Sequence, residues 1–389
     1  ALTTGNYNVA VGLQALKTIT TASNNTAVGY KALDSNTASD NTAVGFDALG
    51  ANTTGADNTA VGYQALEDAT TANHNTAIGN EALKNVTTGG ENTAVGSVSL
   101  ATNTTGGYNV ALGKSALAAN TTASNNTAIG YTALTANTTG TNNVAVGAYA
   151  LDANTTGGEN VAIGNNAATG NTTGASNVAV GRDSFVNNTT GNYNVAVGGL
   201  ALNDNTTASY NVAVGYLAGA LLTTGAQNVA IGSAALDATT TGSNNVAIGQ
   251  DALTANTTAS DNVSIGHNSM VANTTGTDNV AVGTNALDAN TTGTDNTAIG
   301  DNALGANTTA NYNTAVGSAS LDANTTGANN TAVGFASLGA NSTGTDNVAV
   351  GYGALDGNLA SNNVAVGSSA LLANTTGTGN TFVGGLAGD

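Results

Sequence analysis

The chain has 389 residues, of which 7% are charged and 4% aromatic, and it contains neither Trp nor Cys. This composition cannot fill the broad core of a globular domain of the same length, and the lack of Cys excludes disulfides and thiolate metal sites. The net charge of -18 disfavours nucleic acid and anionic membranes as partners. No apolar run is long enough to span a bilayer, so we expect no membrane insertion.

One pentapeptide, Asn-(Thr/Val)-Ala-(Val/Ile)-Gly, recurs 23 times between Asn8 and Asn380. The spacing is 17 residues in 20 of the 22 steps and 16 in the other two. A fixed short period is typical of a solenoid, in which each repeat forms one coil stacked on the next. We number each repeat from its Asn, position 1, to position 17. The sequence predicts an all-β parallel β-solenoid of 23 coils, continuous over residues 1–389.

The two coils of 16 residues distinguish strand from corner. Each lacks one residue in the stretch that reads Asn-Thr-Thr-Gly or Asn-Thr-Thr-Ala in most other repeats, at 36–40 and at 358–362, and its pentapeptide is intact. Loss of a residue from a strand would turn every later side chain to the opposite face, whereas a turn tolerates it. The pentapeptide is therefore predicted to be the strand, and positions 12–15 a corner.

Side-chain alternation predicts the cross-section of a coil. Positions 2 and 4 share one face of the strand, and positions 3 and 5 share the other. We expect Val or Ile at position 4, together with Leu at position 9, to fill the interior. The Ala at position 3 would then face outward, and such a small apolar face predicts side-by-side packing of copies of this chain. The proposed contact column includes Ala43, Ala60, Ala77, Ala94 and Ala196.

The first and last coils follow the repeat pattern without an atypical capping repeat. Solenoid ends carry unpaired strand edges that favour pairing with further strands. We therefore expect continuation by more chain or end-to-end stacking. Together with the lateral packing, this predicts either a homotrimer or an end-to-end filament as the assembly.

The units Asn160–Gly164, Asn228–Gly232 and Asn245–Gly249 resemble the head repeats of trimeric autotransporter adhesins. The longer run Asn58–Leu66, with its Asn-Thr-Thr-Gly type of corner, is similar to repeats of phage tail fibres and bacterial surface fibres. The resemblance covers the whole chain, although coils of adhesin heads are shorter than 17 residues. It implies a left-handed parallel β-roll, assembly of three chains, and a location that is extracellular, on a cell surface or on a virion.

Two columns of side chains are candidate binding sites. Asp261, Asp278 and Asp295 share position 17 of successive coils and could form a divalent-cation ladder, although a solvated acidic face is the favoured interpretation. Tyr30 and Phe46 share position 6 with Tyr63. Such a ladder could dock glycans, but cross-strand aromatic pairs also stabilise sheets without any ligand, and we favour that structural role.

Asn-Thr-Thr triplets on the predicted corners match the N-glycosylation acceptor pattern. Asn and Thr are also ordinary turn residues, so glycosylation is the less favoured interpretation. The candidate acceptors are Asn52, Asn103, Asn120, Asn137, Asn154, Asn171 and Asn188.

We expect no enzyme and no cofactor. His74 and His267 are eleven coils apart, and no Ser/His/Asp pattern or phosphate-binding loop is present. The sequence instead favours a rigid structural or adhesive fibre segment that self-associates. The alternative is an adhesin whose surface columns bind a host glycan or protein receptor. Ice binding is a third and less favoured hypothesis, because position 2 alternates between Thr and Val.

Overall fold

The computed structural model describes residues 3–388. It contains 23 strands of three residues each, one for every pentapeptide, and no helix among the described residues. The first eleven strands are β1 (Val9–Val11), β2 (Thr26–Val28), β3 (Thr42–Val44), β4 (Thr59–Val61), β5 (Thr76–Ile78), β6 (Thr93–Val95), β7 (Val110–Leu112), β8 (Thr127–Ile129), β9 (Val144–Val146), β10 (Val161–Ile163) and β11 (Val178–Val180). The other twelve are β12 (Val195–Val197), β13 (Val212–Val214), β14 (Val229–Ile231), β15 (Val246–Ile248), β16 (Val263–Ile265), β17 (Val280–Val282), β18 (Thr297–Ile299), β19 (Thr314–Val316), β20 (Thr331–Val333), β21 (Val348–Val350), β22 (Val364–Val366) and β23 (Thr381–Val383).

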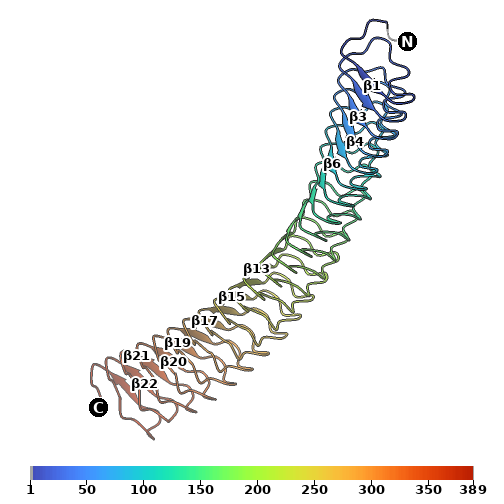
Figure 1. The fold of residues 1–389 in the computed structure, drawn as a ribbon. Coiled ribbons are helices and arrows are strands. Elements are labelled where there is room, and N and C mark those ends of the chain that lie inside the picture. Colours follow the sequence, from blue (N-terminus) through green and yellow to red (C-terminus); the bar gives the residue numbers. More distant parts are fainter. Residues whose placement is uncertain (1–2, 389) are drawn as a thin grey trace. The chain divides into compact units, whose positions relative to one another are not determined.

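Among β1 to β11, and again among β12 to β23, successive strands pair in parallel and in register, so each coil lies on the next (Figure 1). Ala43 of β3 is opposite Ala60 of β4, one repeat later, and the register is unchanged across the 16-residue coil that links β2 to β3. The predicted all-β parallel β-solenoid is therefore confirmed. The pentapeptide contains the strand, and positions 12–15 lie outside it, as the short coils predict.

The chain divides into two compact units, Ala1–Asn194 and Val195–Asp389. Strands β1 to β11 belong to the first unit and β12 to β23 to the second. Each unit repeats the same coil, with one interior and one outward strand face. One description of the coil therefore serves both.

The predicted assignment of the two strand faces is wrong. Ala at position 3 points into the coil and is fully buried, whereas positions 2 and 4 are partly exposed, as in the burial of Thr42, Ala43 and Val44. Leu at position 9 is buried as predicted. The interior also holds Ala or Ser at position 8, Asn at positions 1 and 12, and Gly or Ala at position 15.

The narrow interior explains why Ala, and not Val, lies inside. A Cβ added at Gly219, which occupies position 9, would lie 4.0 Å from the Cβ of Ala213 at position 3, so these two positions face each other across the coil. The last coil carries the one large residue at position 3, Phe382, and it carries Gly388 at position 9. The Phe382 ring occupies the space that a side chain at residue 388 would need. Because a packed interior does not tolerate extra methyl groups, β-branched residues are placed outside.

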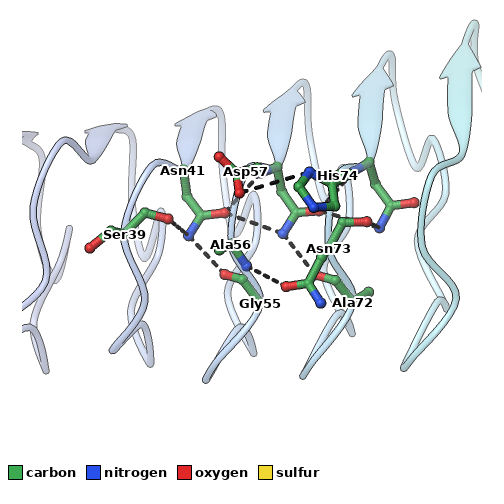
Figure 2. Close-up of polar contacts among 10 residues, drawn as sticks. Ser39, Asn41, Gly55, Ala56, Asp57, Ala72, Asn73 and His74 are labelled. Atoms are coloured by element: carbon green, nitrogen blue, oxygen red, sulfur yellow. Dashed lines mark hydrogen bonds and ion pairs between the residues drawn. The ribbon is translucent and has the colours of Figure 1, made fainter.

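Buried Asn side chains join the coils into two amide ladders, one of which is seen in Figure 2. The backbone N–H and the Nδ2 of Asn58 donate to Oδ1 of Asn41 at 3.0 and 3.2 Å, and its Nδ2 also donates to the carbonyl of Ala72 at 2.8 Å. Oδ1 of Asn58 accepts in turn from the N–H of Asn75 at 3.0 Å. The second ladder follows position 12, where Asn137 Nδ2 donates to Asn120 Oδ1 at 3.1 Å. Each amide thus bonds to neighbouring coils and helps to keep them in register.

The tight turns of the coil require left-handed backbone at fixed positions. In the coil that starts at Asn58, φ is +52° at Gln64, +53° at Leu66 and +58° at His74, the residues at positions 7, 9 and 17. Gly at position 5 has φ near +140° throughout, a conformation that other residues rarely adopt. Position 9 is Leu, Met, Phe, Ala or Gly and never β-branched, which agrees with the steric cost of a branched Cβ at positive φ.

The left-handed conformation at position 9 predicts that shape, and not hydrophobicity, limits substitution there. Leu253 is fully buried with φ of +53°, and Met270 occupies the same position one coil later. We expect Leu253→Ile to destabilise the chain by about 1–3 kcal/mol through backbone strain. Leu253→Met should cost less than about 1.5 kcal/mol. Denaturant unfolding of both variants is the measurement, and equal losses of stability would contradict the assignment.

Two glycines of consecutive coils provide a matched pair. Gly147, at position 5, has φ of +135°, and a Cβ there would lie 2.6 Å from the carbonyl carbon of Gly164. A Cβ at Gly140, at position 15, would also crowd a backbone carbonyl oxygen, that of Gly157. Gly140 lacks positive φ, however, and Ala72 and Ala123 occupy the same position in other coils, so backbone conformation distinguishes the two glycines. We expect Gly147→Ala to destabilise by well over about 1 kcal/mol and Gly140→Ala to cost less. Thermal melting of the two variants tests this, and the reverse order would be inconsistent with the backbone described.

Candidate functional site

The outward strand face is the most extended uniform surface of each unit. In every described coil, positions 2 and 4 carry only Val, Ile, Leu or Thr, so this face holds no charge. The β-branched side chains are exposed to a considerable degree, for example 40% at Ile78, 38% at Ile231 and 37% at Val350. Apolar side chains that stay exposed over many consecutive coils are typical of an interaction surface.

The Ala column is not a self-association surface. Ala43, Ala60, Ala77, Ala94 and Ala196 are all fully buried within their own coils. Their constancy reflects the narrow interior, where a larger side chain would overpack the space opposite Leu at position 9. The sequence prediction that copies pack through this column is therefore wrong, and the surface available for such packing is the opposite face of the strand.

The proposed N-glycosylation acceptors are also placed differently from the prediction. The Asn of each triplet is fully buried, as at Asn52, Asn103, Asn120, Asn137, Asn154, Asn171 and Asn188. Its Nδ2 donates to the carbonyl at position 15 of its own coil, at 2.8–3.2 Å. Only the Thr residues of the corner face outward, and Thr at position 13 donates to the next coil, as from Thr138 to the carbonyl of Thr155 at 3.0 Å. The folded chain does not offer the amides for modification.

Asp261, Asp278 and Asp295 lie at exposed positions of consecutive coils, as the repeat predicts. Asp261 Oδ1 accepts a hydrogen bond from Asn244 Nδ2 at 3.1 Å. Within residues 3–388, no group of three His, Cys, Asp or Glu side chains is placed so that it could hold a metal ion. The three carboxylates are thus a stacked column and not a coordinating cluster.

The aromatic residues Tyr30, Phe46 and Tyr63 do form a ladder. The ring centroids are 5.2 Å apart at both steps, with interplanar angles of 23° and 13°. The rings are exposed by 39%, 43% and 49% and flank the apolar strand face. A similar stack joins Phe335 and Tyr352 at 5.5 Å.

Charged side chains gather beside the first of these aromatic ladders, a feature that the sequence analysis missed. Lys84 Nζ lies 3.3 Å from Glu67 Oε2 and 3.9 Å from Glu81 Oε1, and it donates to Gln64 Oε1 at 3.1 Å. Gln64 Nε2 donates to Glu67 Oε1 at 2.9 Å. These residues occupy positions 7 and 10 of neighbouring coils, so a tabulation of the repeat by position would have brought them together.

Partial burial raises the pKa of several carboxyl groups on the outer surface. At position 10, desolvation is the main cause for Asp152, Asp237, Asp288 and Asp322. The charge of Asp251 adds to the rise in the pKa of Asp237. Neighbouring carboxylates on stacked coils therefore oppose ionisation of one another.

The described residues include no helix long and apolar enough to cross a membrane. No protein-family model matches the chain, and comparison with curated proteins finds no similar sequence. The assignment of a function consequently depends on the surfaces described above.

The raised carboxyl pKa values predict unusual behaviour on acidification. Because the pKa of these carboxyl groups in the folded chain exceeds the unfolded value of 3.8, they bind protons more readily in the folded chain than in the unfolded chain. The free energy of unfolding should thus rise as the pH falls from 7 towards 3.8, and the net charge becomes less negative than -18 in the same interval. Asp237→Asn should stabilise the chain at pH 7 and weaken this dependence. Unfolding temperatures across this range are the measurement, and a fall in stability on acidification would contradict it.

Proposed function

We propose that the chain is a structural segment of an extracellular, cell-surface or virion fibre, in which the stacked coils form a shaft that associates side by side with further copies. The outward strand face is the observation that supports this role most directly. It is uncharged, repeats at every coil, and exposes β-branched side chains that one chain leaves partly uncovered. Association would remove these groups from water, which is favourable in proportion to the apolar area buried.

The area of this face is sufficient for a specific contact. The twelve strands of the second unit, at about 4.8 Å each and with a strip roughly 10 Å wide, present on the order of 600 Å². Two such faces in contact would bury about 1,200 Å² in total, which lies at the lower end of specific interfaces. The first unit presents a comparable strip. Lateral association therefore needs no contribution from the ends of the chain.

A second candidate role is adhesion to a glycan or protein receptor. The observation that favours it is the aromatic ladder of Tyr30, Phe46 and Tyr63 beside the Lys84 network, because aromatic rings next to mixed hydrogen-bonding groups are typical of recognition surfaces. The two roles are compatible, since the strand face and the network occupy different positions of the coil.

Side-by-side association can be tested with a double substitution on the strand face and a matched control on the same two coils. Val214→Lys with Ile231→Lys places two charges on exposed apolar positions of β13 and β14. Thr224→Lys with Thr241→Lys adds the same charges at exposed corner positions. Burying unpaired charges in an interface is strongly unfavourable, whereas solvated Lys is not.

We expect the unmodified chain to sediment well above 37.3 kDa at micromolar concentration. The strand-face double variant should shift towards the 37.3 kDa monomer, and the corner variant should not. X-ray scattering of the cross-section should show the same difference, with melting curves to verify folding. A monomeric unmodified chain, or identical behaviour of both variants, would exclude this mode of association.

A further inference from the structure

The three rings of the first aromatic ladder differ in which faces they leave open. Phe46 is covered on both faces, by Tyr30 on one side and Tyr63 on the other. Lys31 Nζ lies 5.7 Å from the centroid of the Tyr30 ring. Tyr63 is stacked on one side only, because the next residue of the column is Asn80, and among the described residues no further ring lies against it. Tyr63 is also the most exposed ring of the three, at 49%.

Hydrogen-bonding groups lie around this open end of the ladder. The N–H of Glu81 donates to the carbonyl of Tyr63 at 2.9 Å, so residues 80 and 81 lie one coil beyond the ring. Glu81 is then linked to Lys84, and Lys84 to Gln64 and Glu67, by the contacts described above. The site therefore combines a partly exposed ring face with amide, ammonium and carboxylate groups that are already ordered by one another.

The charge around the site limits what it can bind. Asp34, Asp47 and Asp68 add three carboxylates to those of Glu67 and Glu81, against the cations Lys31 and Lys84. Glu67, Asp34 and Asp68 all lie close enough to Asp47 to raise the pKa of its carboxyl group, and Lys31 lowers it. A ligand that carries a carboxylate, sulfate or phosphate would be repelled.

We propose that Tyr63, with Gln64, Glu67, Asn80, Glu81 and Lys84, forms a shallow binding site for a pyranose that bears no acidic group. The apolar face of the sugar ring would stack on the open face of Tyr63, and its hydroxyls would bond to the polar side chains. This inference deepens the adhesive role proposed above and depends on it, but it is independent of side-by-side association. The preordered polar groups lower the entropic cost of binding.

The chain supplies its own control for this site. Tyr352 is the exposed end of the Phe335 stack, is 62% exposed, and is followed in its column by Ser368. The residues at positions 7 and 10 beside it, Gly353 and Asp356, include no cation. If a stacked ring alone were enough, Tyr352 would bind sugars as well as Tyr63 does.

The experiment is saturation-transfer NMR and titration of the full chain with three probes: methyl glucopyranoside, methyl N-acetylglucosaminide and glucuronic acid. We expect binding of one or both of the first two and weaker or no binding of the acid. Tyr63→Ala should weaken binding at least about tenfold, as loss of an aromatic stacking contact predicts. Tyr63→Phe should retain most of the affinity, and Tyr352→Ala should leave it unchanged.

Lys84→Met removes the cation and keeps much of the side-chain volume, and it should also weaken binding. Circular dichroism melts verify that each variant is folded. No binding of any probe, preference for the acid, or equal losses in Tyr63→Ala and Tyr352→Ala would overturn the proposal. Sedimentation of the same samples tests side-by-side association separately. A chain that associates but binds no sugar would contradict the binding site alone, and a chain that binds sugar but does not associate would contradict the shaft function alone.

Discussion

The in-register amide ladder is the interaction on which the rest of the structure depends. Each Asn at position 1 bonds to the side chain of the preceding Asn of its column and to the corner carbonyl of its own coil, as Asn58 does with Asn41 and Ala72. A buried amide without partners would cost about 1–3 kcal/mol, so a shift of one coil relative to the next would be penalised at both ladders. The ladders also explain how a chain with so few large apolar residues holds together, because much of its interior consists of hydrogen-bonded Asn side chains.

The narrow interior that the ladders define determines which side of the strand faces water. Only a small side chain, Ala or Ser, fits at position 3 opposite Leu or Met at position 9. In the last coil, Phe replaces Ala at position 3 and Gly replaces Leu at position 9, which shows that the two positions share one volume. Val and Ile are consequently displaced to the outer face. The same packing constraint that stabilises a single coil thus creates the long apolar surface to which we assign association.

Differences in sequence between coils, at positions that face outward, create the candidate binding surfaces of this regular fold. A solenoid presents equivalent positions of successive coils in straight columns, so residues 17 apart in sequence become neighbours. The ladder of Tyr30, Phe46 and Tyr63 and the contacts of Lys84 with Glu67 arise in this way from outer positions that the fold leaves free to vary. A site can therefore appear on a few coils without disturbing the others, and a shaft and a recognition surface can coexist in one chain.

The repeat by itself determined the parallel coil, its 17-residue length, the strand and the corner, because a fixed period and two tolerated deletions leave little choice. The burial of Leu at position 9 was likewise predictable from its hydrophobicity. The sequence did not determine which face of the strand points into the coil, because Ala and Val are both apolar and alternation alone cannot distinguish the interior face from the exterior one. That choice depended on the space across the coil, which pairs positions 3 and 9. The buried state of Asn52 and its equivalents also depended on tertiary contacts, since Asn52 bonds to Gly55 of its own coil and also to Asn36 of the preceding coil, which only stacking brings within reach.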